Sequence, residues 1–382
     1  MALIGLGKID KSLIPIIVGC IFCFVNRIIN QYDGSLLLEN KIIPNIFIAF
    51  SDLLTLIPYL ILKKRSKQIK DSDIQITKTY HLEYIYTNSD LENTQGKGRF
   101  ILLSGVILFV EAIMFASTFK IKSNSWYLYI LITSAFYYII FKIKLFKHHY
   151  LSIIIIILSG IIIDLVLGNL QNDFLNHFFL LLISILRIIL LSFYYVIVKY
   201  TIEKKFVSVY EIIFFIGIIN FVMFIIFAIF DYFFFDIDDY EKYFTNFNGI
   251  ELLVALGVMI TQLGMDICIT ITDKNESPCH IFIIFVFGQL AYYFFNLNEY
   301  LVIVIICLIL MLFFTLVFNE IIEINLWGLS LNTKRNIINR AQSDGDETFI
   351  VKSETFGENN EKDDNTESLI ELKNNEVYDK ND

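Results

Sequence analysis

Six ionisable side chains lie within long apolar stretches of the sequence, where such groups are rare. They are Arg27, Asp52, Glu111, Asp164, Arg187 and Asp266. A charge in the hydrocarbon core of a bilayer costs at least ~2.5–3.5 kcal/mol on insertion scales, so an ionisable residue there usually has a functional reason. The chemistry that such groups offer is binding of a polar solute, pairing with one another, or uptake and release of a proton.

Regular spacing places several polar groups on common helix faces. Gln262, Asp266 and Thr270 recur every four residues, and Ser104 and Glu111 are seven residues apart. Polar stripes on otherwise apolar helices are expected to face a water-filled cavity or one another. We therefore predict a solute site between helices. Its candidate substrate-binding residues are Asp52, Glu111, Arg187, Asn220, Gln262, Asp266 and Gln289.

The same charges have a structural alternative, in which they form buried ion pairs that fix helix packing. Arg187 could pair with Glu111 or Asp52, and Arg27 with Asp164. Because four acids accompany only two arginines, two acids would lack a cationic partner if all six groups lie in the membrane. A desolvated carboxyl tends to take up a proton, which makes Glu111 or Asp266 a candidate for proton coupling.

The elements that must position these residues are ten apolar stretches, each close to the ~20 residues that a membrane-spanning helix needs. They are 12–31, 42–62, 100–118, 125–142, 150–168, 177–200, 211–234, 250–271, 279–295 and 299–319. Helices are expected because lipid offers backbone groups no hydrogen-bond partner. Pro58 is expected either to kink the second stretch or to lie near its end.

The composition excludes several other classes of protein. Hydrophobic residues make up 56% of the chain and charged residues only 18%, whereas soluble domains average about 25% charged residues. A net charge of −9 argues against nucleic-acid binding. Five cysteines exclude a disulfide scaffold, and Cys20 and Cys23 are interpreted as helix-packing thiols. We expect no metal, no cofactor and no enzymatic activity, since no catalytic motif is present.

Lysine and arginine counts predict the orientation of the chain in the membrane. The alternating gaps that include 63–99 carry 17 basic residues and the other gaps only four. The positive-inside rule then places both termini in the cytosol. Segment 63–99 is expected to be a cytosolic loop, and 321–382 an acidic, largely disordered tail. His148 and His149 are interpreted as a solvated loop pair.

Two local stretches carry a resemblance to a known family. Residues 199–205, of sequence KYTIEKK, precede Ser208 to Glu211 and Gly217, and residues 275–280 read NESPCH before the ninth span. With ten spans, they resemble the drug/metabolite transporter superfamily, which includes nucleotide-sugar transporters, chloroquine-resistance-transporter-like proteins and EamA-like membrane proteins. The resemblance covers roughly residues 12–320. It implies an all-α transmembrane domain over 1–320, built as a 5+5 inverted repeat, with the substrate between the halves.

The predicted function is secondary-active transport of a small polar organic solute, of the metabolite or nucleotide-sugar class, by alternating access. Whether a proton is coupled, with Glu111 or Asp266 as its carrier, is left open, as are homodimer formation and cytosolic partners of the tail. The alternative is a non-transporting membrane scaffold that recruits partners through that tail. The organelle also stays open between Golgi or ER, vacuole or endolysosome, and plasma membrane.

Overall fold

The computed structural model describes ten segments of the chain. These are residues 4–6, 13–29, 42–70, 96–118, 125–142, 145–168, 174–205, 207–234, 249–295 and 301–324. All belong to one unit, residues 1–325. Residues 325–382 of the predicted tail and most of the predicted loop 63–99 therefore lie outside the described residues.

Within the described residues, most of each of the ten predicted stretches is helical. The helices are α1 (Leu13–Ile29), α3 (Ile43–Leu53), α4 (Leu56–Lys70), α6 (Lys97–Thr118), α7 (Leu128–Phe141), α8 (Lys147–Gly168), α9 (Phe174–Lys205), α10 (Val209–Phe234), α12 (Gly249–Asn275), α13 (Ile281–Phe295) and α14 (Leu301–Phe318). Short 3-10 turns, η1 (Ser125–Tyr127) and η2 (Pro278–His280), precede α7 and α13.

The described part is thus almost entirely helical, and its helices have the composition of membrane spans. Five are long and apolar enough to cross a bilayer: Ile43–Lys64, Lys147–Val166, Leu182–Lys205, Val209–Phe233 and Gly249–Asn275. Large apolar side chains point outward, such as Leu253 at 70% exposure and Ile139 at 67%. Exposing so much apolar surface to water is unfavourable, whereas exposing it to lipid is not. These observations indicate an all-helical membrane protein.

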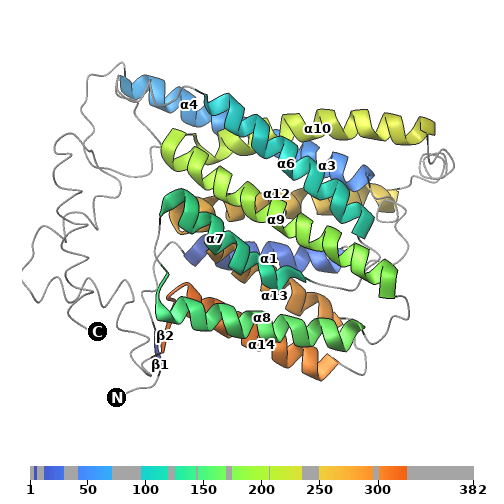
Figure 1. Ribbon diagram of the computed structural model, residues 1–382. Helices are drawn as coiled ribbons and strands as arrows, with labels where there is room; N and C mark the ends of the chain where they lie inside the picture. Colours follow the sequence, from blue (N-terminus) through green and yellow to red (C-terminus); the bar gives the residue numbers. More distant parts are fainter. Residues whose placement is uncertain are drawn as a thin grey trace, which may run out of the picture. The chain divides into compact units, whose positions relative to one another are not determined.

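Helices from the first and second halves of the chain pack against one another (Figure 1). Helix α1 packs on α12 and α13, while α6 and α7 pack on α9. Helix α3 contacts α10 and α12, α6 also contacts α10, and α8 lies along α14. The core is therefore made by pairs that join distant parts of the sequence.

Small residues allow some of these helices to approach closely, as is common in membranes. A Cβ atom at Gly217 on α10 would lie 2.6 Å from Cβ of Asp52 on α3. One at Gly105 on α6 would lie 2.8 Å from Ile219 of α10. At Gly160 on α8, a Cβ atom would overlap the side chain of Tyr127.

We expect Gly160→Ala to lower the melting temperature of the purified protein. The buried Tyr127 ring and its Cβ atom both lie in the space that the new methyl group needs, and overpacking of this kind costs about 1–3 kcal/mol. Thermal unfolding in detergent measures the effect. Gly98→Ala is the matched control, because nothing lies within 4 Å of a Cβ atom there. Equal melting temperatures of the two variants would contradict the prediction.

The second predicted span is broken at Leu54 and Thr55, two residues after Asp52. Helix α3 ends at Leu53 and α4 begins at Leu56. Pro58 has no N–H to donate to the carbonyl of Leu54, so the regular ladder fails at this point. Thr55 holds the break, since its Oγ1 donates to the Asp52 carbonyl at 2.6 Å. Pro58 therefore acts at a break within the span rather than at its end.

A short sheet joins the two ends of the described chain. Strand β1 (Ile4–Leu6) pairs antiparallel with β2 (Ile322–Ile324), with Gly5 opposite Glu323. Residues 322–324 at the start of the predicted tail thus form a strand, and the largely disordered state predicted for the tail stays a prediction. β-branched Ile322 and Ile324 favour a strand, and β1 supplies the pairing partner.

Candidate functional site

The centre of the candidate site is a buried ion pair between α6 and α9. Glu111 Oε1 lies 3.2 Å from Arg187 Nε, and the two side chains are only 12% and 7% exposed. The predicted pairing of Arg187 with Glu111 is confirmed. Trp126 of η1 lies beneath the guanidinium, with its ring centroid 4.7 Å from Cζ. Arg187 thus combines an ion pair with a cation–π contact.

A second arginine lies close to this pair. Arg27 on α1 hydrogen-bonds Cys23 one turn earlier and lies within electrostatic reach of Arg187. Asp164 accepts a hydrogen bond from Tyr127, and the pairing of Arg27 with Asp164 stays a prediction. Two guanidinium groups close to one another can together bind an anionic group.

A chain of hydrogen bonds links α1 to α12. Asn26 Nδ2 donates to Gln262 Oε1 at 3.0 Å, and Gln262 Nε2 donates to Asp266 Oδ1 at 3.0 Å. Thr270 Oγ1 donates to the backbone carbonyl of Asp266 at 2.7 Å. The predicted stripe of Gln262, Asp266 and Thr270 on α12 is therefore confirmed, and Gln262 contacts Asn26 of α1.

Asp52 brings a second carboxyl to this network. It is only 6% exposed and lies within electrostatic reach of Asp266. Its Oδ1 has no hydrogen-bond partner among the described residues. Two acids from α3 and α12 thus share one buried region, where like charges repel.

Tyr194 on α9 connects the acids to the ion pair. It lies within electrostatic reach of Asp266, Asp52 and Glu111. Tyr194 was not predicted from the sequence, although a signal was present, since it follows Arg187 by seven residues and so shares its helix face. Two further members of the site, Asn26 and Trp126, lacked such a signal because each acts through a contact with a distant helix.

The two remaining predicted residues lie at the edge of this group. Asn220 is 3% exposed, and its Oδ1 has no hydrogen-bond partner among the described residues. It follows Gly217, which touches Asp52, by one helical turn. Gln289 on α13 lines a small, mostly apolar cavity together with Trp126 and Tyr127. That cavity has room for about one or two water molecules.

A separate polar cluster that was not predicted lies at the end of α12. Lys199 of α9 donates to the carbonyls of Lys274 and Glu276, at 2.8 and 3.0 Å, and pairs with Glu203 at 2.8 Å. These bonds satisfy carbonyls that the end of a helix leaves without partners. Lys199 therefore has a capping role, and the beginning of the 199–205 stretch is explained by structure.

No family model matches the chain, and no curated protein matches it significantly. The resemblance to the drug/metabolite transporter superfamily therefore rests on the number of apolar stretches and on two short local sequences.

Proposed function

We propose that this protein is a secondary-active transporter of a small polar organic solute. The observation that carries the proposal is a set of neighbouring polar side chains within an apolar bundle, termed the polar layer. Side chains from α1, α3, α6, α9 and α12 contribute to it, with Glu111–Arg187 at 3.2 Å on one side and Asn26–Gln262–Asp266 on the other. Purely structural ion pairs need no such collection of acids, amides and a tyrosine.

The pairing of the helices supports a two-fold arrangement of ten spans as an inverted repeat. In such a repeat, spans one to five exchange with spans six to ten. The contact of α1 with α12 then matches that of α6 with α9, and α1 with α13 matches α7 with α9. The α3–α10 and α8–α14 contacts map onto themselves. The 3-10 turns η1 and η2 also occupy equivalent positions, before spans four and nine.

The break between α3 and α4 further supports a transport role. Discontinuous helices line the substrate sites of many carriers, because unwound backbone offers polar groups inside the membrane. Here the break, at Leu54 and Thr55, begins two residues after Asp52. It therefore lies close to the buried carboxyl that we place in the solute site.

The charges favour a solute with an anionic group, either zwitterionic or of the nucleotide-sugar class. Arg187 is held by one acid and stacked on Trp126, with Arg27 within reach. A carboxylate or phosphate of the solute can take the place of Glu111 on the guanidinium, since bidentate contacts with arginine are strong. The released Glu111, with Asp52 and Asp266, then offers acceptors to amino or hydroxyl groups.

A thermal-shift screen of the purified protein tests the proposal first, against nucleotide sugars, sugar phosphates, amino acids, organic cations and drugs. A ligand at 100 times its dissociation constant stabilises the folded state by ~2.7 kcal/mol. We expect a ligand whose shift is lost in Arg187→Ala and kept in Arg99→Ala, which removes an exposed arginine at the start of α6. The same ligand is then expected to be taken up by proteoliposomes.

Two results would oppose the proposal. One is uptake by proteoliposomes that does not exceed uptake by empty liposomes for every ligand that binds. The other is full biological function after neutralisation of Glu111 and Asp266, combined with loss of function when residues 341–382 are deleted. The second result would support the scaffold alternative.

A further inference from the structure

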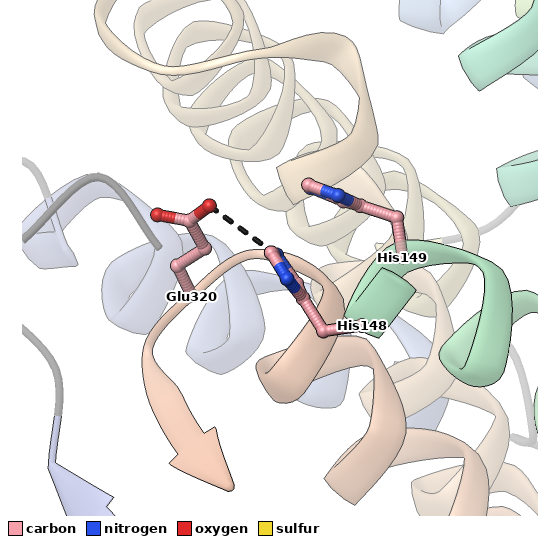
Figure 2. Close-up of side chains that lie close together, drawn as sticks. All are labelled: His148, His149 and Glu320. Atoms are coloured by element: carbon pink, nitrogen blue, oxygen red, sulfur yellow. Dashed lines mark ion pairs between the residues drawn. The ribbon is translucent and has the colours of Figure 1, made fainter. Parts of the chain in front are cut away.

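Two histidines and a glutamate meet where α8 begins and α14 ends (Figure 2). His148 and His149 lie in the first turn of α8, and Glu320 lies two residues after α14. One ligand atom from each residue lies within 4.8 Å of the other two. This set is outside the polar layer described above and has no part in the proposed transport.

The sequence predicted a solvated loop for His148 and His149, but the fold buries this group instead. His148 is only 2% exposed. The two imidazole rings lie 4.0 Å apart, and the ring of Phe318 lies against His149 at 4.7 Å. Sequence alone could not predict this, because the burial depends on the packing of α8 along α14, more than 150 residues later.

Glu320 adopts a backbone conformation that a glutamate rarely takes. Its φ angle is 58°, in the left-handed region. The Glu320 N–H donates to the Val317 carbonyl and the Ile321 N–H to the Leu316 carbonyl, at 3.1 and 2.9 Å. This is the turn that ends helices at a left-handed residue, where glycine is the usual choice. An acid at this position therefore costs stability and calls for a reason.

His148 is buried without the hydrogen bonds that an imidazole normally makes. Its Nδ1 has no hydrogen-bond partner among the described residues. Its Nε2 lies 3.3 Å from Glu320 Oε1, but the two groups are not aligned for a hydrogen bond. Buried polar atoms rarely remain so, and an imidazole and a carboxylate that converge on one point are typical of a metal site.

We propose that His148, His149 and Glu320 bind a divalent transition metal ion, with Zn²⁺ as the best fit. Zinc takes histidine nitrogen and carboxylate oxygen at about 2.0–2.2 Å in tetrahedral geometry, which places neighbouring ligand atoms ~3.3–3.5 Å apart. The 3.3 Å between His148 Nε2 and Glu320 Oε1 agrees with this spacing. Imidazole ligands favour zinc over magnesium or calcium. Water would supply the fourth ligand.

His149 is the ligand that must change its contacts. Its Nδ1 accepts a hydrogen bond from the Phe146 backbone N–H at 3.0 Å. Ligation by either ring nitrogen of a neutral imidazole gives up that bond, because only one nitrogen then has a free lone pair. The bound metal would tie the start of α8 to the end of α14, beside β2.

The test uses the full-length protein, stripped of metal with a chelator, and titrated with Zn²⁺ in a calorimeter. We expect one ion per chain and a higher melting temperature with zinc. His148→Ala, His149→Ala and Glu320→Gln are each expected to weaken binding at least tenfold. His280→Ala and Cys23→Ser are the matched controls and should bind as wild type does, since neither residue belongs to the His148, His149 and Glu320 cluster. His280 lies instead beside Ser277, at 2.9 Å, and Glu276, at 3.8 Å.

Glu320→Gly separates metal binding from folding. Glycine suits the left-handed position better than glutamate, so this variant is expected to melt in the presence of chelator at least as high as wild type. It should nevertheless lose zinc binding. Wild type that binds no zinc, or a Glu320→Gly variant that binds it as tightly as wild type, would overturn the proposal. Loss of binding in Cys23→Ser would also overturn it.

Discussion

Glu111→Gln is expected to lower the stability of the folded protein by about 3–5 kcal/mol and to abolish transport. The substitution leaves Arg187 buried, at 7% exposure, without its carboxylate, and an uncompensated buried charge is costly. The stacking on Trp126 remains but cannot replace an ion pair. Thermal unfolding in detergent and uptake by proteoliposomes measure the two effects.

Two double variants separate the structural part of this effect from the transport part. The exchange Glu111→Arg with Arg187→Glu restores opposite charges and is expected to recover much of the lost stability. Glu111→Leu with Arg187→Met removes both charges, which is often neutral or stabilising. Neither is expected to transport, because the solute meets the wrong groups. Full transport by the apolar pair would show that the ion pair only holds α6 against α9.

Asp52→Asn is expected to raise the melting temperature while lowering transport about tenfold to a hundredfold. Asp52 and Asp266 lie within electrostatic reach of each other in a buried region, so one amide removes a repulsion. No hydrogen bond to Oδ1 is lost, since that atom has no partner among the described residues. Gains of about 0.5–2 kcal/mol at the cost of activity are typical of functional sites.

The expected loss of transport follows from the contact with the solute. A hydrogen bond to a charged group contributes about 1.5–3 kcal/mol, which corresponds to roughly tenfold to a hundredfold in affinity. Asp231→Asn, near the end of α10, is the control and should leave both quantities near wild type. A lower melting temperature of Asp52→Asn, with unchanged transport, would show that Asp52 serves helix packing alone.

The positions of the helices and the chemistry of the polar layer were predictable from the sequence. In lipid, a run of about 20 apolar residues satisfies its own backbone hydrogen bonds by forming a helix. The length of the runs was therefore enough to predict the helices. Ionisable groups such as Glu111, Arg187 and Asp266 stood out because they are expensive there. Spacing along one helix also predicted the contact of Gln262 with Asp266, because residues four apart are neighbours.

The contacts between helices could not be predicted from the sequence. Arg187 had two candidate partners by type and depth, and only the packing of α6 on α9 selects Glu111 over Asp52. The bond from Asn26 to Gln262 joins residues 236 positions apart. Local spacing carries no information on such a pair, because it depends on which faces of two distant helices meet.

What the residues alone decide is where the chain is apolar, where charge interrupts it and hence which chemistry the membrane region can hold. What the fold decides is which of these groups share a cavity, an ion pair or a metal ion. His148 illustrates the difference: its type was visible in the sequence, but its burial against Glu320 follows from α8 lying along α14. Side-chain chemistry is a property of single residues, whereas proximity is a property of packed helices.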